Sequence, residues 1–329
     1  MTEDKVRVGI IGAGYWGRKL IEEYGSLSRK RDDIELAMVV DSDRERLATI
    51  AKEFGLPRDK LGTEVSRALN DGSIEAVHVA TPNETHYTVG MGALNAGKNL
   101  LLEKPMAMTT REALKLAHKA DQESLVLHVG HVFRFNNAVK QTRSLLEAGT
   151  VGTPLTFRLT WEDFLNPLPS GRDIIFDLCP HPIDILNYLS GEWPRRVRAI
   201  GRSFLRKERG REEVAHSEAE IDGDAFATIH VSWLYSGPKR RLIEITGSKG
   251  CIETDALNQK VSIYTPEDSK EYAIEVNNTI NDMITNFVSS VRYGRASENS
   301  SLVGAMTVNV LAAMRRSMKT GRFIDVIRD

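Results

Sequence analysis

A glycine-rich turn between a predicted strand and a predicted helix constrains the fold of this chain most. The segment VGIIGAGYWGRKL places Gly12, Gly14 and Gly17 in a G-x-G-x-x-G pattern. The first glycine allows a tight turn, the second lets the backbone approach a pyrophosphate, and the third lets the helix pack on the strand. A phosphate would then meet free N–H groups at the helix N-terminus. The pattern therefore predicts an α/β domain that binds a dinucleotide.

Short, nearly continuous aliphatic runs alternate with helical patterns over the first 130 residues. Such runs are typical of parallel strands that are covered on both faces. The alternation of strand and helix predicts a Rossmann domain, an α/β fold with a doubly wound parallel sheet. We expect its strands at residues 6–11, 34–40, 74–80, 98–103 and 124–130.

The pattern changes after about residue 130. An amphipathic helix over 135–149 is followed by a strand over 153–163, and residues 195–276 consist mostly of alternating strands. Two helices and a short strand end the chain. This predicts an α+β domain with a large, mostly antiparallel sheet. We divide the chain into a dinucleotide-binding domain, residues 1–130, and a substrate-binding domain, residues 131–329, with a boundary soft by about ten residues.

Composition excludes several classes of protein. The 329 residues are 41% hydrophobic and 27% charged, with a net charge of −1, so neither disorder nor a general attraction to nucleic acid or membrane is indicated. The two cysteines cannot form a disulfide framework or a four-cysteine metal site. The first residues lead directly into a strand, without a secretory h-region. We expect a cytoplasmic protein with no nucleic-acid, membrane or metal partner.

The end of the second predicted strand offers a candidate for cofactor discrimination. Asp41 lies 24 positions after Gly17, near the offset of a carboxylate that binds a ribose 2′-hydroxyl. A carboxylate there repels a 2′-phosphate, which favours NAD over NADP. Ser42 is ambiguous, and Arg44 or Arg46 could reach a phosphate. Asp41 could instead cap the next helix, and S-adenosylmethionine or a flavin remains as an alternative ligand.

Two further segments lie where the carboxyl ends of the strands should meet, the edge at which open α/β sheets bind ligands. The segment ATPNETH follows the strand over 74–80, and LLEKPMA places Lys104 after the next strand. Each has a structural alternative. Thr81 and Glu84 have the spacing of a capping box, and Lys104 could be a solvated surface residue.

The stretch FDLCPHPIDILNYL places Asp177, His181 and Asp184 in an apolar frame, although isolated buried charge is costly. These side chains either satisfy one another or do chemistry at a cleft wall. Proline is tolerated in the first turn of a helix, so we expect regular helix no earlier than Leu178 or Cys179. Asp184 either has a structural role or supports a catalytic side chain. His181 could be a structural histidine. Cys179 is either a buried thiol or a metal ligand.

Five motifs of this chain resemble, in their order, those of the glucose–fructose oxidoreductase, inositol dehydrogenase and rhizopine catabolism (Gfo/Idh/MocA) family of NAD(P)-dependent oxidoreductases. They are GIIGAGYWG, VATPNETH, EKPMA, GHVFRFNNAVKQTRSLLEAGTVGTP and FDLCPHPIDIL. The resemblance implies a catalytic lysine at Lys104, an acid/base pair at Asp177 and His181, and a residue lining the substrate cleft at Arg134. Relatives act mostly on secondary hydroxyls of sugars, cyclitols or nucleotide sugars. Many form homodimers or homotetramers that pair open sheet faces.

We therefore expect an NAD-dependent sugar dehydrogenase or ketoreductase, with a nucleotide sugar slightly favoured. The alternatives are a glycosidase that uses transient oxidation and a catalytically silent NAD-binding sensor. We expect six residues to bind the substrate: Lys104, Arg134, Trp161, Arg172, Asp177 and His181. Of these, Trp161 and Arg172 are candidate contacts to a base or phosphate of a nucleotide sugar. The expected cofactor-binding residues are Gly12, Gly14, Tyr15, Trp16, Gly17, Asp41, Ser42, Thr81, Pro82, Asn83, His86, Glu103 and Lys104.

Overall fold

The structure is a computed structural model that describes residues 5–165, 168, 173–206, 212–294 and 298–327. The chain divides into two compact units. The first contains Met1–Gly130 and Ile280–Ala305, and the second contains His131–Thr279 and Met306–Asp329. The sequence-based division did not anticipate that residues 280–305 belong with the first unit.

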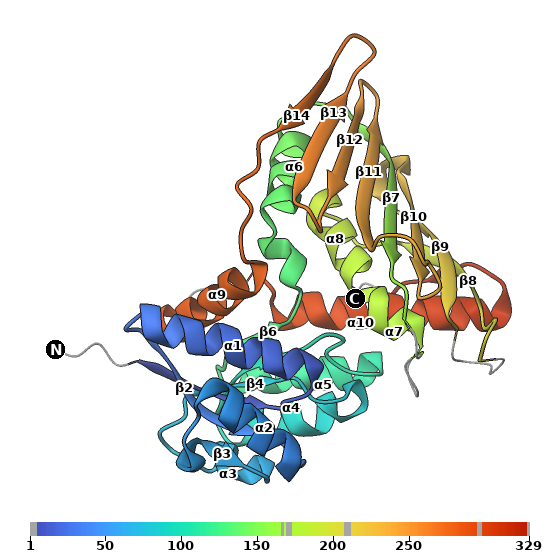
Figure 1. The fold of residues 1–329 in the computed structure, drawn as a ribbon. Helices are drawn as coiled ribbons and strands as arrows, with labels where there is room; N and C mark the ends of the chain where they lie inside the picture. The colour runs from blue at the N-terminus through green and yellow to red at the C-terminus, as the bar shows by residue number, and fades with distance from the viewer. Residues whose placement is uncertain (1–4, 166–167, 169–172, 207–211, 295–297, 328–329) are drawn as a thin grey trace. The chain divides into compact units, whose positions relative to one another are not determined.

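Within the described residues of the first unit, six strands form one parallel sheet in the order β3-β2-β1-β4-β5-β6 (Figure 1). This is the strand order of a dinucleotide-binding Rossmann fold. The strands are β1 (Val6–Ile11), β2 (Ile34–Val40), β3 (Leu61–Gly62), β4 (Ala76–Val79), β5 (Asn99–Leu102) and β6 (Leu127–Val129).

Five α-helices in the described part of the first unit connect consecutive strands of this sheet, and another joins the unit from later in the sequence. They are α1 (Tyr15–Lys30), α2 (Arg44–Phe54), α3 (Val65–Leu69), α4 (His86–Asn95), α5 (Thr110–Gln122) and, from the later part of the chain, α9 (Thr279–Tyr293). Asp43 caps α2 by accepting hydrogen bonds from the backbone N–H groups of Glu45 and Arg46. Asp41 is therefore not the N-cap, so the structural alternative for this residue is wrong.

Nine strands form the sheet of the second unit, counted over its described residues, in the order β14-β13-β12-β11-β7-β10-β9-β8-β15. The central pair β7 and β10 is parallel and the other pairs are antiparallel, so the prediction of a mostly antiparallel sheet is confirmed. The strands are β7 (Pro154–Glu162), β8 (Arg196–Arg202), β9 (Val214–Glu220), β10 (Phe226–Ser232), β11 (Arg240–Gly247), β12 (Cys251–Asp255), β13 (Lys260–Tyr264), β14 (Ser269–Tyr272) and β15 (Ile324–Asp325).

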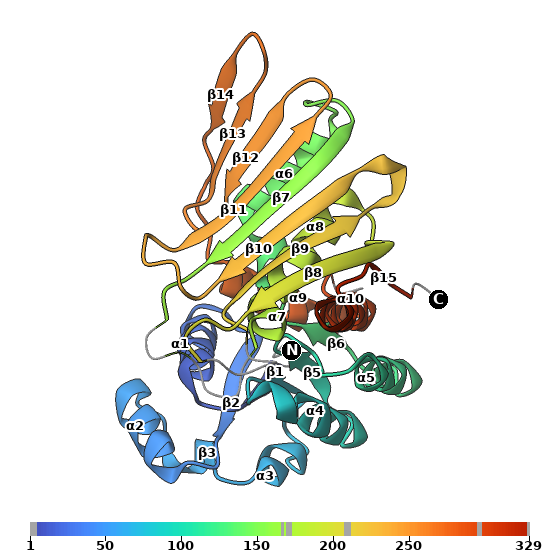
Figure 2. The same ribbon diagram turned by 90° about the vertical axis from the view of Figure 1, so that its right-hand side faces the viewer.

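Helices cover one face of this sheet, and Figure 2 shows the bare face towards the viewer. The covering helices include α6 (Asn137–Glu147), α7 (Ile174–Leu178) and α8 (Pro180–Ser190). The alternation of side chains explains the asymmetry. Ala227, Ile229 and Val231 of β10 are buried, whereas the intervening residues are partly or fully exposed up to His230. Helix α10 (Ser301–Thr320) begins in the first unit and continues in the second.

No helix in the described ranges has both the length and the apolar character needed to cross a membrane.

Candidate active site

The glycine turn between β1 and α1 has the geometry that a dinucleotide requires. Gly12 has a φ of +101°, and a Cβ atom there would lie 2.5 Å from the carbonyl oxygen of Ala80. A Cβ atom on Gly17 would lie 1.9 Å from the carbonyl oxygen of Gly12, so neither position accepts a side chain. At Gly14, the N-cap of α1, a Cβ atom would meet nothing within 4 Å. The open space beside the first N–H groups of α1 fits a pyrophosphate.

Asp41, at the end of β2, is 8% exposed and links the glycine turn to α2. Its carboxylate accepts hydrogen bonds from the backbone N–H groups of Ala13 (2.7 Å) and Asp43 (2.9 Å). Nη1 of Arg46 lies 2.9 and 3.0 Å from the two carboxylate oxygens. These four contacts match the roughly four lone-pair sites of a carboxylate. A ribose hydroxyl that binds Asp41 therefore has to replace a hydrogen bond from the half-exposed Arg46 to this carboxylate.

A hollow of about 520 Å³ lies next to this carboxylate in the first unit. Ala13, Gly14 and Tyr15 of the glycine turn line it on one side, and Arg46 and Thr49 of α2 line it on the other. Tyr15 is 81% exposed, and Ser42 is exposed as well. Two predicted cofactor residues, Gly14 and Tyr15, thus line this hollow, and Asp41 contacts its lining residues Ala13 and Arg46.

The loop after β4 differs from its predicted capping box. Thr81 and Glu84 do not cap a helix, because Asn83–Thr85 form a separate 3₁₀ turn and α4 begins only at His86. The Thr81 hydroxyl instead accepts a hydrogen bond from the Thr85 hydroxyl at 2.8 Å. Thr81 and Asn83 are partly exposed and Pro82 is exposed, so these residues remain accessible to a ligand.

His86 differs from its predicted role because its side chain lies beneath the loop and is only 1% exposed. Its Nδ1 lies 2.8 Å from the carbonyl oxygen of Pro105, and its Nε2 lies 2.9 Å from that of Thr81. Burial lowers the pKa of this imidazole, although the two carbonyl partners oppose that effect. His86 therefore connects two loops and offers no free polar atom to a cofactor.

The turn after β5 contains Glu103, Lys104 and Pro105, with a cis Lys104–Pro105 peptide bond. Lys104 is partly exposed. Glu103 is only 6% exposed, and its Oε1 lies 3.3 Å from Nε2 of His78 on β4. The sequence placed Glu103 among the cofactor contacts, whereas the structure directs its carboxylate into the first unit.

In the second unit, a break between two helices presents Asp177 and His181. Helical structure begins at Ile174, where Asp173 caps α7 by accepting a hydrogen bond from the N–H of Phe176 at 2.9 Å. The helix that contains both prolines begins after Leu178, as expected, but the sequence did not predict the separate short helix α7 before it. Cys179 separates α7 from α8, which begins at Pro180. This break follows from Pro180 and Pro182, which have no N–H to continue the helix.

Asp177 and His181 are partly exposed, while every other residue from Asp173 to Leu186 is buried. The imidazole of His181 packs edge-to-face on Phe133, with 5.1 Å between ring centroids. Cys179, between the two polar residues, is fully buried, and burial raises the pKa of its thiol. The structure thus separates Asp177 and His181, which face the surface of this unit, from the buried thiol.

Arg134 forms a buried ion pair with Asp184, and its predicted contact with a substrate stays a prediction. Its Nε donates a hydrogen bond to Oδ1 of Asp184 at 2.7 Å, and its Nη2 donates to Oδ1 of Asn187 at 2.8 Å. The side chains of Arg134 and Asp184 are 9% and 1% exposed. Both partners of Arg134 lie on α8, so the ion pair anchors the helix that carries His181.

Trp161 also differs from its predicted role. It lies on the helix-covered face of β7 with no exposed surface, packed edge-to-face on Phe133 at 5.5 Å between centroids. It therefore offers no ring face to a nucleotide base. Arg172, the other predicted contact, lies outside the described residues.

Arg241 on β11 is a charged residue of this region that sequence reasoning missed. It is 5% exposed, pairs with the carboxylate of Asp163, and donates a hydrogen bond to the carbonyl oxygen of Glu162 at 3.0 Å. Burial lowers the pKa of its guanidinium, while Asp163 and the nearby Asp177 oppose the shift. Asp177 thus lies within electrostatic reach of a buried cation.

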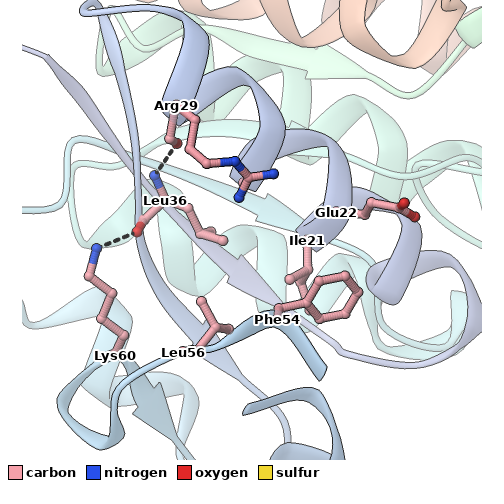
Figure 3. Close-up of a pocket in the computed structure, with 9 residues that line it drawn as sticks. Ile21, Glu22, Arg29, Leu36, Phe54, Leu56 and Lys60 are labelled. Carbon is pink, nitrogen blue, oxygen red and sulfur yellow. Dashed lines mark hydrogen bonds between the residues drawn. The ribbon is translucent and has the colours of Figure 1, made fainter. Parts of the chain in front are cut away.

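A second hollow in the first unit, of about 300 Å³, contains none of the predicted site residues. Ile21 of α1, Leu36 of β2, Phe54 of α2 and Leu56 line it (Figure 3). Nζ of Lys60 donates a hydrogen bond to the carbonyl oxygen of Leu36 at 2.9 Å, which Figure 3 marks with a dashed line. We assign this hollow no role.

Comparison with known proteins matches both parts of the chain to a single family. Residues 6–131 match the oxidoreductase family with an NAD-binding Rossmann fold, and residues 139–253 match the GFO/IDH/MocA C-terminal domain. The UDP-N-acetylglucosamine 3-dehydrogenase of Acidithiobacillus ferrooxidans is 30% identical over 259 residues, which are 79% of this chain and 77% of the relative. The chain belongs to the Gfo/Idh/MocA family.

Solved structures agree on the fold of this Gfo/Idh/MocA protein. That of UDP-N-acetylglucosamine 3-dehydrogenase from Acidithiobacillus ferrooxidans has a TM-score of 0.84 at 24% identity and covers 95% of this chain and 98% of its own. That of levoglucosan dehydrogenase in complex with NADH and levoglucosan has a TM-score of 0.88 at 19% identity, covering 99% and 100%. These likenesses concern the fold, and the family matches of both domains make the chain an NAD(P)-dependent oxidoreductase of the Gfo/Idh/MocA family.

Proposed function

We propose that this protein transfers hydride between NAD and a secondary hydroxyl or ketone of a sugar, and that Lys104, Asp177 and His181 carry the reaction. The observation that carries the assignment is the break between α7 and α8. It leaves Asp177 and His181 partly exposed in a segment whose other side chains are buried. Contact with a ligand explains why these two ionisable side chains are exposed while their neighbours are buried.

The residue types suit the oxidation of an alcohol, for which the nicotinamide supplies the hydride acceptor. His181 takes the hydroxyl proton, because an imidazole titrates near neutral pH and can move a proton in either direction. Asp177 orients the imidazole or binds another substrate hydroxyl. The ammonium group of Lys104 stabilises negative charge that develops on the reacting oxygen.

Asp41 supports a preference for NAD over NADP. Its carboxylate is held in place by the N–H groups of Ala13 and Asp43, and a negative charge so fixed repels a 2′-phosphate. We infer that a ribose hydroxyl replaces one of the contacts from Arg46, the exposed partner. Arg46 also provides the positive charge through which NADP could bind more weakly.

For the substrate we propose a sugar, with a nucleotide sugar favoured. The support is the 30% identity to a UDP-N-acetylglucosamine 3-dehydrogenase. The burial of Trp161 removes one of the two residues from which the sequence favoured a nucleotide contact. A cytoplasmic location remains a prediction.

We also propose a homodimer or homotetramer that pairs the bare faces of the nine-stranded sheets. Ile200, Phe226 and Tyr264 project from that face and are 53%, 47% and 45% exposed. They lie among opposite charges such as Arg158 and Glu244, which are 3.3 Å apart. A two-fold axis pairs the same surface patch of both subunits, and a face with apolar side chains and charges of both signs suits such pairing. Phe226→Glu is expected to lower the mass measured by light scattering, and an unchanged mass would contradict this interface.

The catalytic assignment is tested with Lys104→Ala and His181→Ala, each beside a matched substitution at an exposed site. Lys115→Ala and His118→Ala on α5 serve as controls, because both side chains are exposed and lie outside the motifs. Removing a general acid or base typically costs at least about 100-fold in turnover. We expect that loss in both site variants, with unchanged melting temperatures and fully active controls. Turnover within a few-fold of wild type in both site variants would refute the assignment.

A further inference from the structure

A chain of three polar side chains crosses the interior of the first unit and ends at Glu103. The hydroxyl of Tyr24, on α1, lies 3.2 Å from Nδ1 of His78, on β4. Nε2 of His78 lies 3.3 Å from Oε1 of Glu103, which follows β5. Tyr24 and His78 have no exposed surface, and Glu103 is 6% exposed. Polar groups are costly to bury in a sheet core, and the cofactor-binding motif does not require Tyr24 or His78.

The direction of the hydrogen bond between His78 and Glu103 follows from the charge on Glu103. Burial alone would raise the pKa of its carboxyl, but the hydrogen bond and charge of His78 hold the pKa below the usual value, with smaller contributions from Trp16 and Lys104. An ionised carboxylate only accepts hydrogen bonds, so Nε2 of His78 donates to it. Burial raises the pKa of Tyr24 and keeps its hydroxyl protonated. The Tyr24 hydroxyl donates to Nδ1 when His78 is neutral and accepts from it when His78 is charged, so this hydrogen bond is compatible with both states of the imidazole.

Glu103 is also confined from the side opposite His78. A Cβ atom on Gly130, directly after β6, would lie 2.8 Å from Oε2 and 2.9 Å from Oε1 of the carboxylate. The backbone N–H of Gly130 donates to the carbonyl oxygen of Leu102 at 2.8 Å, which fixes this glycine beside β5. The carboxylate is therefore wedged between a hydrogen-bond donor and backbone.

Around Glu103 lie Tyr24 and Trp16 from α1, His78 from β4, His86 from α4 and the adjacent Lys104. Glu103 is the only carboxylate among these groups of the described structure. Because Tyr24 has no exposed surface, the hydrogen-bonded series from Tyr24 to Glu103 does not reach solvent at Tyr24 and does not form a proton wire. Its remaining role is to fix one negative charge next to the lysine.

We propose that His78 and Tyr24 are positioning residues, which hold the Glu103 carboxylate in one place beside Lys104 and thereby set the electrostatics of the reaction. This inference deepens the proposed function and rests on it for its consequence in catalysis. Its structural part, the state of Glu103, can be measured without any turnover.

The direct test is the titration of Glu103 followed by NMR of protein labelled with ¹³C at the glutamate carboxyl carbons. Glu103→Gln identifies the resonance. In the wild type we expect titration below the usual value of about 4.3. In His78→Phe the desolvation of Glu103 is no longer opposed, and its midpoint should rise by at least about two pH units, towards the range of buried carboxyls. Tyr24→Phe, which removes one hydroxyl group, should give a smaller rise.

The same variants are then compared in turnover, as kcat/KM against pH. His78→Phe should lose at least about tenfold on the acidic side and recover at alkaline pH, because Glu103 ionises again there, one pH unit being tenfold in the ratio of the two forms. His78→Asn, which keeps an N–H donor, should restore part of the loss. Leu101→Val is the packing control, since Leu101 pairs with His78 in the sheet and is fully buried.

Three outcomes are informative. The inference is overturned if the titration midpoint of Glu103 in both His78→Phe and Tyr24→Phe stays within about half a pH unit of its wild-type value. A loss of activity that is independent of pH and equal in Leu101→Val also overturns it, because only packing is then affected. If the Glu103 midpoint shifts as expected while the wild type oxidises no sugar, the positioning of Glu103 stands and the proposed function fails.

Discussion

Removal of the Arg134 guanidinium is expected to destabilise the second unit by several kcal/mol. Asp184, its partner, has a side chain that is 1% exposed and accepts a hydrogen bond from Arg134 at 2.7 Å. Removing one partner of such a buried pair typically costs about 3–5 kcal/mol, because the remaining charge is left without compensation. Arg134→Met keeps most of the side-chain volume, so we expect a loss in this range.

A double-mutant cycle separates the pair from other effects of the substitutions. Replacing both charges by apolar groups of similar volume, as in Arg134→Met with Asp184→Leu, should cost less than the sum of the single variants by at least about 2 kcal/mol. Arg143→Met is the matched control, since its ion pair with Glu147 is exposed, at 45% and 62%. Such surface pairs contribute about 0–1 kcal/mol.

Guanidinium unfolding, followed by tryptophan fluorescence, measures these losses. Of the four tryptophans, Trp161, Trp193 and Trp233 belong to the second unit and Trp16 to the first, so the signal comes mainly from the second unit. Transitions of the two units are fitted separately, because a chain of two units need not unfold in one step. A cost below about 1 kcal/mol for Arg134→Met, or an additive double variant, would refute the buried-pair account.

Three further predictions concern the cofactor site and the cysteines. Asp41→Ala should weaken NAD binding by about 10–100-fold, the range of a hydrogen bond to a charged group, and NADP binding by less, because the repulsion is removed while Arg46 remains; Kd values from calorimetry measure both. Gly17→Ala should abolish NAD binding in the same assay, because its Cβ atom would lie 1.9 Å from a carbonyl oxygen. At pH 8 iodoacetamide should modify Cys251 much faster than Cys179, since burial raises the pKa of the Cys179 thiol and leaves little thiolate; peptide mass spectrometry gives the rates.

Each of these predictions has a clear contrary result. An equal loss for NAD and NADP in Asp41→Ala would show that Asp41 does not discriminate between them. Normal NAD affinity in Gly17→Ala would contradict the close approach of α1 to the glycine turn. Modification of Cys179 at the rate of Cys251 in the native protein would contradict its burial.

Periodic segments made most of the fold predictable from the sequence. The predicted bounds of β1 and β2 coincide with the observed ones, because each is a single aliphatic run that ends at a turn. The strand β3 and the helix α3 were missed, since two and five residues are too few to show a period. The return of residues 280–305 to the first unit was also missed, because helical periodicity identifies a buried face without identifying what covers it.

The candidate site was predictable where backbone geometry demands a residue type, as at Gly12 and Gly17. It was less predictable where charged groups find partners distant in sequence. Arg134 pairs with Asp184, 50 residues away, and no local pattern indicates such a partner. For Trp161 a signal was present, because it shares the alternation of the buried residues Phe157 and Leu159 on β7. That alternation indicated burial in the sheet and not contact with a substrate.

The central claim is that this protein catalyses net oxidation of a sugar hydroxyl by NAD, and formation of NADH tests it most directly. Purified protein is incubated with NAD and, separately, with free sugars, cyclitols and nucleotide sugars, and the absorbance of reduced nicotinamide is followed. The account predicts NADH that accumulates in proportion to product with at least one sugar, and far less in His181→Ala. Cleavage of a glycoside with no net NADH, or NAD binding without turnover of any compound in the panel, would contradict it.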